Sequence, residues 1–480
     1  MSTPATGLSP QESVERALAA SRSGDCVAIA EETSGANLRW AGNTLTTNGV
    51  YRSRQLTVIA IDRRGDGAAA GVVSRAGVRP DQIEDVVREA EHAAAEGTPA
   101  EDEAQLPGPE KADSFGINNT GEPGWDAAPG RTDIGVLRDF ACALGETLRG
   151  AAAADRKLYG FAEHELDSTF LGTSAGLRLR YDQPTGRIEL NAKSADLERS
   201  AWIGAGTRDF TDVDIAALDA GLAERLGWAE RSVSLPPGRY ETLLPPTAAS
   251  DLLVYLYWQA GAKDALDGRT VFSKPGGGTR VGERLSPLPV TLSSDPRAAG
   301  LGCAPFVITH ASGPDSSVFD NGLALRRTSW IEDGSLAALH SSRHSAALAG
   351  LPVTPAIDNL TFAASPAGGA ALPTLQEMIA STRRALLLNC LWYIREVDAQ
   401  TLLLTGLTRD GVYLVENGEV VGAVNNFRFN ESPVAMLGRL LEVGVTVPTL
   451  PREWSDYFNR VAMPPVRVEG FNMSSVSQAS

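Results

Sequence analysis

The sequence predicts an α+β protein, with an N-terminal α/β region of antiparallel sheet and helices and a C-terminal β-rich region of curved sheet around a buried helix. Three observations predict this class. Apolar residues alternate with polar ones between Asp25 and Ser74, helical periods flank that stretch, and short β-type runs fill the chain beyond residue 231. With 480 residues, of which 43% are hydrophobic and 21% charged, the chain is long enough for about two to four domains with buried cores.

Residues 1–95 predict one α+β domain. Ser9 and Pro10 open an amphipathic helix over residues 9–22. The alternating stretch that follows predicts antiparallel strands, and a second apolar stripe predicts a helix over residues 81–96. Residues 96–113 are acidic and rich in proline, with too little apolar surface to form a core, and are therefore a predicted linker.

A middle region over residues 114–230 is expected to complete the N-terminal half. It contains a predicted helix over 133–154 and an alternating stretch over 160–195, where Pro184–Gly186 predicts the turn of a hairpin. A further helix is predicted over 212–226.

The C-terminal β-rich domain is predicted over residues 231–475, with 476–480 as a tail. It opens with a strand at Tyr240–Leu244 and a helix over 248–266 that is apolar almost all round and is therefore expected to be buried. The β-type runs that should wrap this helix are Pro289–Leu292, Val318–Asp320, Leu323–Ile331, Thr361–Ala363 and Leu402–Asn426.

Charge, cysteine content and hydropathy indicate the compartment and exclude some partners. Lys and Arg number 43 against 59 Asp and Glu, a net charge of −16 that argues against nucleic-acid binding. The cysteines, Cys26, Cys142, Cys303 and Cys390, are isolated, as in a reducing cytosol. The first residues lack the pattern of a secretory signal, and no apolar stretch is long enough to span a membrane. A cytoplasmic protein without a membrane partner is expected.

Local motifs predict no catalytic residue. Ser174 lies in a GxSxG pattern, but the period-two residues that follow predict a strand where a nucleophile elbow needs a helix. His340 and His344 are spaced like a metal pair, yet Ser341 stands where a zinc protease has its glutamate. These residues alone indicate a fold class and a compartment, and no reaction.

The stretch from Asn389 to Pro433, NCLWYIREVDAQTLLLTGLTRDGVYLVENGEVVGAVNNFRFNESP, resembles the characteristic segment of the TldD/PmbA family. The segments Ser34–Gly49, Ser174–Leu190 and Pro464–Asn472 are similar to other parts of it, so the resemblance covers residues 12–475. It implies an α+β N-terminal part, a β-rich C-terminal part, and two-fold or heterodimeric assembly around a cavity.

Two subunit types exist in the family that this chain resembles. The TldD type carries HExxxH on the buried C-terminal helix and a distant cysteine as further metal ligand, whereas the TldE, or PmbA, type lacks them. Aligned on Leu266–Gly268, this chain has Gln259, Ala260 and Asp264 at the His, Glu and His positions, and no cysteine after Cys390. The resemblance is therefore to the TldE type, with no metal ligand and no cofactor in this chain.

The resemblance implies a non-catalytic subunit that pairs with a TldD-like, zinc-containing metallopeptidase to form a chamber for unfolded or small peptides. Two alternatives stay open: an autonomous hydrolase that uses His310, His340 or His344, and a homodimeric peptide-binding protein. One segment of the characteristic stretch is a candidate for lining the cavity or for a structural role, with core packing the simpler interpretation of its two phenylalanines: Asn425, Asn426, Phe427, Arg428, Phe429 and Asn430.

Overall fold

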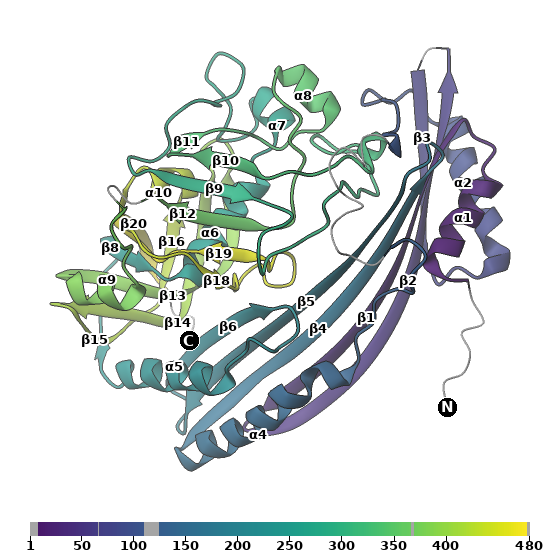
Figure 1. Ribbon diagram of the computed structural model, residues 1–480. Helices are drawn as coiled ribbons and strands as arrows, with labels where there is room; N and C mark the ends of the chain where they lie inside the picture. Colours follow the sequence, from purple (N-terminus) through teal and green to yellow (C-terminus); the bar gives the residue numbers. More distant parts are fainter. Residues whose placement is uncertain (1–7, 66, 110–123, 366–368, 478–480) are drawn as a thin grey trace.

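The computed structural model describes residues 8–65, 67–109, 124–365 and 369–477. An open antiparallel sheet forms the N-terminal half, and a second sheet and a closed barrel form the C-terminal region (Figure 1). The predicted α+β class is confirmed. Residues 110–113 of the predicted linker and 478–480 of the predicted tail lie outside the described residues.

The N-terminal sheet has the strand order β3-β2-β1-β4-β5-β6. Its first three strands confirm the strands predicted from the alternation between Asp25 and Ser74, and residues of the middle region supply the others. Odd-numbered residues of the first strand, such as Val27 and Ile29, pack on one face, while even-numbered ones, such as Ala28, pack on the other. The strands are β1 (Asp25–Ala41), β2 (Thr44–Arg64), β3 (Gly67–Ala76), β4 (Arg156–Thr173), β5 (Arg178–Ser194) and β6 (Ser200–Thr207).

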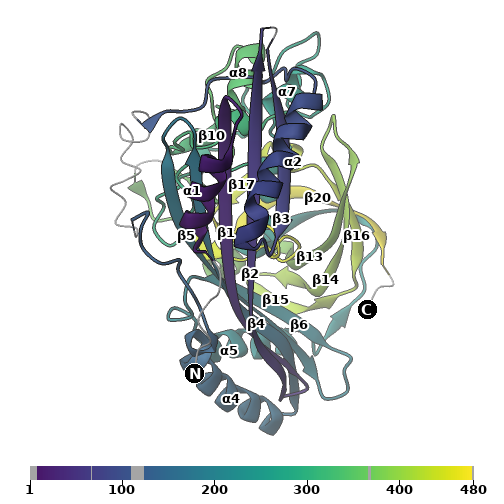
Figure 2. The ribbon, with the colours of Figure 1, turned by 90° about the vertical axis from the view of Figure 1, so that its right-hand side faces the viewer.

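Helices cover one face of this sheet. α1 and α2 lie over one end, and α4 and α5 over the other (Figure 2). Helix α2 lies so close to β3 that a Cβ on Gly71 would stand 2.2 Å from the carbonyl oxygen of Ala90. The four predicted helices are confirmed. Three lie within their predicted bounds: α1 (Pro10–Ala20), α2 (Ile83–Glu96) after a 3₁₀ turn at Pro80–Gln82, and α4 (Arg138–Ala153) after a 3₁₀ turn at Ile134–Leu137; the fourth, α5 (Ile215–Trp228), begins and ends later than predicted.

The hairpin of β4 and β5 turns ten residues earlier than predicted. Its turn lies between Thr173 and Arg178, where Gly176 adopts a φ of +97°, so the GxSxG pattern forms a strand-to-strand turn. Pro184, the predicted turn residue, lies within β5 opposite Leu166. A proline is tolerated there because β6 pairs with β5 only from Gly186 onward, which leaves no ladder bond on that side for a proline to break.

The C-terminal region contains a closed barrel. Its strands follow the order β13-β8-β20-β16-β14, and β14 pairs back to β13; β15, β7 and β17 extend it. Its elements are β7 (Ser232–Val233), β8 (Gly238–Leu244), α9 (Leu375–Ser381), β13 (Arg384–Asp398), β14 (Leu403–Glu416), β15 (Glu419–Val424), β16 (Phe427–Glu431), α10 (Pro433–Leu437), β17 (Leu440–Val443) and β20 (Val466–Val476).

A second sheet with the order β11-β10-β9-β12-β19-β18 lies beside the barrel. Leu323–Ile331 is a strand only at its end, and Val318–Asp320 is a 3₁₀ turn capped by the Ser317 hydroxyl, so these two predictions were wrong. The elements are β9 (Val290–Ser294), η4 (Val318–Asp320), β10 (Thr328–Glu332), β11 (Ser335–Leu336), α8 (Arg343–Ala349), β12 (Leu360–Ala364), β18 (Val447–Thr449) and β19 (Val461–Met463).

The apolar helix α6 (Pro246–Trp258) is buried between the barrel and the second sheet, and contacts β8, β13, β18 and β19. The predicted helix over 248–266 is not continuous: it ends at Trp258, and a separate helix, α7 (Ala262–Leu266), follows. The break is the point where the predicted motif positions lie.

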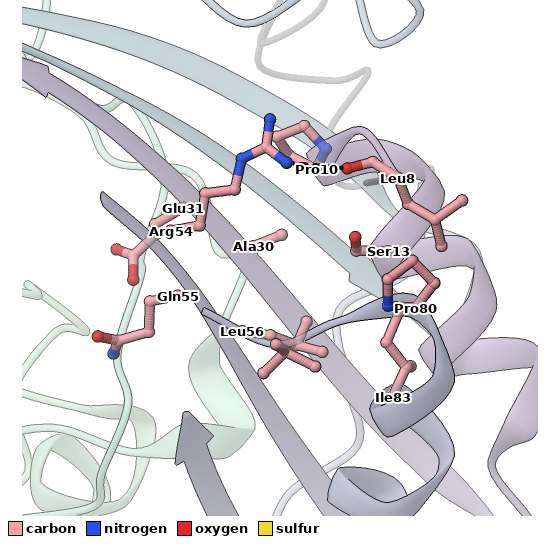
Figure 3. Close-up of a pocket in the computed structure, with 11 residues that line it drawn as sticks. Leu8, Pro10, Ser13, Ala30, Glu31, Arg54, Gln55, Leu56, Pro80 and Ile83 are labelled. Carbon is pink, nitrogen blue, oxygen red and sulfur yellow. Dashed lines mark hydrogen bonds between the residues drawn. The ribbon is translucent and has the colours of Figure 1, made fainter. Parts of the chain in front are cut away.

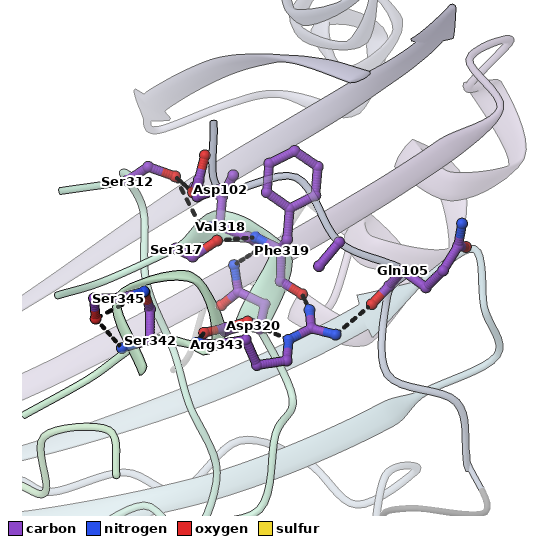
Figure 4. Close-up of polar contacts among 12 residues, drawn as sticks. Asp102, Gln105, Ser312, Ser317, Val318, Phe319, Asp320, Ser342, Arg343 and Ser345 are labelled. Carbon is purple, nitrogen blue, oxygen red and sulfur yellow. Dashed lines mark hydrogen bonds and ion pairs between the residues drawn. The ribbon is translucent and has the colours of Figure 1, made fainter. Parts of the chain in front are cut away.

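The two halves pack through an apolar interface and a polar clamp. Phe306 and Phe319 pack against Val27 and Ile29 on the face of the sheet opposite the helices. Beside them, the Arg343 guanidinium pairs with Asp320 at 2.6 Å and donates to the carbonyl oxygens of residues 105 and 319 (Figure 4). The open sheet and the C-terminal region therefore form one packed body.

In the part of the chain that the structure describes, no helix is long and apolar enough to cross a membrane.

Candidate functional site

The position that corresponds to a metal motif in the predicted alignment lies at the junction of α6 and α7. Gln259 caps the end of α6 and is partly exposed, whereas Ala260 is buried. Asp264 lies in α7 and pairs with Arg269 at 3.5 Å. An amide, a methyl group and a carboxylate already paired with a cation do not make the nitrogen-rich ligand set that zinc prefers. These residues do not fit a metal ion.

The backbone of His340 pairs with the backbone of the α6–α7 junction. The His340 amide donates to the Ala260 carbonyl at 2.7 Å, and its carbonyl accepts from Ala262 at 2.8 Å. Its ring packs edge-on against Tyr257 and Trp330, with centroids 4.2 and 4.7 Å away. Burial lowers the pKa of His340 to about 3, so the imidazole is neutral.

A cavity of about 380 Å³ lies next to the junction. Asp315 lines it and accepts a hydrogen bond from the Lys263 amide at 2.9 Å, and burial raises the pKa of this carboxyl. A Cβ on Gly261 would stand 2.2 Å from the Asp315 carboxylate, so the close approach requires glycine there. Gly261 is the N-cap of α7, three residues after α6 ends.

The histidines that the sequence singled out lie apart. His344 is in α8, whereas His340 precedes that helix and has its side chain in the core. His310 lies on the sheet side, where its Nε2 is 3.5 Å from Glu31, and this carboxylate raises its pKa. Among the described residues, no group of three or more His, Cys, Asp and Glu side chains is arranged to hold a metal ion.

The candidate segment over 425–430 belongs to the barrel. Phe427 and Phe429 are fully buried in the barrel core, where the Phe429 ring lies 5.7 Å from that of Phe471. Asn425 accepts a hydrogen bond from the Leu235 amide, Asn426 and Asn430 are half-buried, and Arg428 points outward. The two phenylalanines pack a core.

A row of carboxylates that sequence reasoning missed lies on the face of the sheet opposite the helices. Glu163, Glu165 and Asp167 occur at every second position of β4, so their side chains share that face. The Tyr51 hydroxyl donates to Glu165 at 2.7 Å, and that of Thr33 donates to Asp167 at 2.5 Å. We call these three residues the carboxylate row. Burial and the neighbouring carboxyls raise the pKa values of Glu165 and Asp167.

A cavity of about 180 Å³ lies between the carboxylate row and a loop at residues 451–460, and it adjoins a second cavity of about 270 Å³ that shares Thr185, Asn459 and Arg460 with it. Arg187 pairs with Glu163 and with Asp456 of that loop, and Arg460 donates to Thr185 at 3.0 Å and pairs with Asp358. The result is a trench with one acidic wall and one mixed wall. The only sign of this trench in the sequence is that Glu163, Glu165 and Asp167 stand at every second position.

The same loop reaches the end of α6. Trp454 contacts the rings of Tyr255 and Trp258, at centroid distances of 5.5 and 5.1 Å, and Tyr457 projects into solvent. The trench and the α6–α7 junction are therefore joined by one aromatic loop, and a chain lying along it could contact both. This surface offers charged groups, hydroxyls and aromatic rings, which suit binding.

Residues 237–475 match the family described as the PmbA/TldA metallopeptidase C-terminal domain. TldE from Thermococcus kodakarensis has a similar structure, with a TM-score of 0.75 at 14% identity over 96% of this chain and 99% of that one. A candidate modulator of DNA gyrase from Thermotoga maritima gives 0.74 at 16% identity over 96% and 99% of the two chains.

A second candidate gyrase modulator, from Bacteroides thetaiotaomicron, gives a TM-score of 0.73 at 14% identity over 97% of this chain and 98% of that one. No curated protein matches the chain in sequence. At such low identities the structural likeness indicates a shared fold, while the family match rests on the sequence of the C-terminal half.

Proposed function

The chain belongs to the TldD/PmbA family, and from this premise we propose that it is a non-catalytic subunit that pairs with a TldD-like zinc metallopeptidase. Together the two subunits would enclose a chamber in which unfolded or small peptides are cut. The metal and the catalytic glutamate belong to the partner, and the complex acts in the cytoplasm, without a nucleic acid or a membrane.

One observation carries the proposal: the α6–α7 junction has Gln259, Ala260 and Asp264 where a TldD-type subunit has its motif. Ala260 cannot accept a proton from water, and its buried backbone is bonded to His340. Next to Ala260, a side chain at residue 261 would meet the Asp315 carboxylate. The residues of this junction are suited to packing.

The trench supports a binding role beside the active site of a partner. An extended peptide presents backbone donors and acceptors at every residue, and hydroxyls and carboxylates can satisfy them without reading the sequence. The carboxylate row would attract a cationic side chain or a free amino terminus. Cleavage of many unrelated sequences would follow, since binding would depend on an unfolded backbone.

The test measures zinc content and cleavage of an unstructured peptide for this chain alone, for an HExxxH homologue from the same genome alone, and for their mixture. We expect this chain to have neither zinc nor activity, and the mixture to cleave faster than the homologue alone. Co-elution of the two chains from a sizing column would accompany the gain.

Two controls separate the proposal from the alternatives. The partner with its motif glutamate replaced by glutamine should co-elute with this chain but cleave nothing. Stoichiometric zinc in this chain alone, lost in the variants His344→Ala or His310→Ala, would contradict the proposal and support an autonomous enzyme. Peptide binding by this chain alone, without any complex, would support a homodimeric peptide-binding protein instead.

A further inference from the structure

Residues 304–320, which we call the strap, run from the C-terminal region to the open sheet and back. Buried rings anchor both ends of the strap, because Phe306 and Phe319 pack in one apolar cluster with residues of β1, β2 and β4. Between these anchors lies a tip over residues 310–316, in which five of the seven residues are exposed. The position of the tip therefore depends on polar contacts.

The strap also borders the cavity of about 380 Å³ beside the α6–α7 junction. Ile308 and Thr309 of the strap line this cavity, as do Asp315 and Ser316 of its tip. Asp315 accepts a hydrogen bond from the Lys263 amide at the junction. A displacement of the tip would therefore change how far the cavity is open.

A histidine joins the tip to the open sheet. The Nδ1 atom of His310 lies 3.2 Å from the Thr57 hydroxyl of β2, and its Nε2 atom lies 3.5 Å from a carboxylate oxygen of Glu31 in β1. Glu31 points away from α1, to the face of the sheet that the strap contacts (Figure 3). A hydrogen bond of 2.7 Å between the hydroxyls of Thr57 and Ser74 extends the contact to β3.

The other charged groups around the tip are carboxyl groups. The Ser312 hydroxyl donates to Asp102 at 2.6 Å in an exposed contact (Figure 4). The ordinary pKa of a carboxyl group is about 4 and that of histidine is 6.5, so His310 is the group in this set that titrates near neutral pH. By element, the carboxyl groups are Glu31 of β1, Asp167 of β4, which interacts with Glu31, Asp102 of the predicted linker, Asp315 of the tip and Asp264 of α7.

Glu31 stabilises the charged form of His310. Its carboxylate raises the pKa of the imidazole above the ordinary 6.5, against the opposing effect of partial burial. Because the folded pKa is the higher one, the contact contributes its full stability below pH 6.5 and loses it as the pH rises through the folded pKa. The neutral ring retains only its contact with Thr57, so the tip is held more weakly at alkaline pH.

We propose that the strap is a proton-controlled cover of the cavity: the charged His310 holds the tip against Glu31, and loss of its proton to water releases the tip. The moving part ends at residue 310, because two hydrogen bonds with Asn321 fix the backbone of Thr309. The released tip uncovers the cavity on the side of Asp315 and Ser316. This device needs only the present chain and does not rest on the proposed function.

Hydrogen exchange at pH 6.0 and pH 8.5 tests the release. Exchange rates are divided by those of an unstructured peptide of the same sequence, which removes the intrinsic effect of pH. The amides of Gly313 and Val318 report on the tip, since they donate to the Ser316 carbonyl and the Ser312 hydroxyl. Their protection should fall about threefold at the higher pH, because a partly exposed ion pair contributes little.

Two variants remove the charge pair from opposite sides. His310→Gln and Glu31→Gln should each give low protection of the tip at both pH values, so that the change with pH disappears. His92→Gln is the matched control. His92 pairs with Glu96 at 3.3 Å within α2, on the other face of the sheet, so this variant should keep the wild-type change.

Thiol labelling tests whether the cavity opens with the tip. Thr309→Cys places a thiol in the cavity wall, and the exposed Cys142 serves as reference in the same molecule because the other three native cysteines are buried. The labelling rate of the introduced thiol, relative to that of Cys142, should rise about threefold from pH 6.0 to pH 8.5. Adding His310→Gln should make this ratio the same at both pH values.

Four results would overturn the proposal: equal protection of the wild-type tip at both pH values, a change with pH that survives in His310→Gln, a change that is lost in His92→Gln, or a labelling ratio that does not vary with pH. Circular dichroism spectra check that each variant is folded. Since His310 and Glu31 are both partly exposed, their substitution should leave the fold intact. The pairing with a metallopeptidase is judged by its own test, whatever the result here.

Discussion

The two halves of the molecule solve the problem of strand edges in opposite ways. The C-terminal strands close into a barrel, since β14 pairs back to β13, and the barrel interior holds Phe427, Phe429 and Phe471. The N-terminal sheet stays open, carries the carboxylate row on one face, and leaves the outer side of residues 44–53 without a partner strand among the described strands. The comparison suggests that stability lies mostly in the closed half and surfaces for interaction mostly in the open one.

His340 in the C-terminal half and the carboxylate row on the open sheet should respond to acid in opposite directions. In the C-terminal half, the pKa of His340 is lowered, so the unfolded chain binds a proton that the folded one does not, and stability falls as pH falls below 6.5. On the open sheet, the pKa values of Glu165 and Asp167 are raised, so the folded state binds more protons, and stability falls as pH rises above about 4.

The largest effect is expected from the barrel core. Phe429→Ala should lower the free energy of unfolding by about 3–5 kcal/mol, because the ring is fully buried and packs against Phe471 and Gly406. Denaturant unfolding measures it. Val50→Ala, at an exposed position of β2 in the open sheet, should stay within about 0.5 kcal/mol of the wild type. Equal losses of unfolding free energy in both variants would contradict the conclusion that stability lies mostly in the closed half.

Much of the open sheet could be predicted from the sequence, because every strand pair in it except that of β1 with β4 joins neighbours along the chain. Alternation between Asp25 and Ser74 was enough to place β1, β2 and β3. The turn of the next hairpin was misplaced, because Pro184 indicates a turn locally but lies where β6 has already ended. Only the pairing of a third strand shows that the proline is harmless.

The C-terminal half was harder to predict because its features depend on distant residues. At the break in the apolar helix, Asp315 and His340, more than fifty residues away, contact Gly261 and Ala260. The trench likewise forms only when the loop near residue 456 folds over β4. The alternate spacing of the three carboxylates predicts that they share one face of the sheet. Their burial depends on a loop almost three hundred residues later in the chain.

An intermediate effect is expected at His340. Between pH 7 and pH 5 the wild type should lose about 2 kcal/mol through this residue, since its pKa moves from 6.5 in the unfolded chain to about 3 in the folded one. His340→Phe keeps a ring beside Tyr257 and Trp330 and removes the titration. The variant should lose about 2 kcal/mol less than the wild type over this range. Equal losses, measured by denaturant unfolding at both pH values, would show that the histidine is protonated in the folded protein.

The smallest effect is expected on the carboxylate row. Asp167→Asn should stabilise the protein by about 1 kcal/mol at pH 7, because it removes one of two neighbouring half-buried negative charges. The amide oxygen can still accept from Thr33, and its NH₂ group can donate to Glu165. The gain should shrink as pH falls toward 4, where the wild-type carboxyls become protonated.

Asp167→Ala is the control for this last substitution, since it removes the charge together with the Thr33 hydrogen bond. It should therefore be less stable than Asp167→Asn at every pH. If Asp167→Asn instead destabilises the protein at pH 7, a cation must balance Asp167 as Arg187 balances Glu163, and Arg460 would be the first to test. The charges of the open half would then stabilise the fold, as the packed core does in the closed half. The trench would have no uncompensated negative charge with which to bind a cationic peptide.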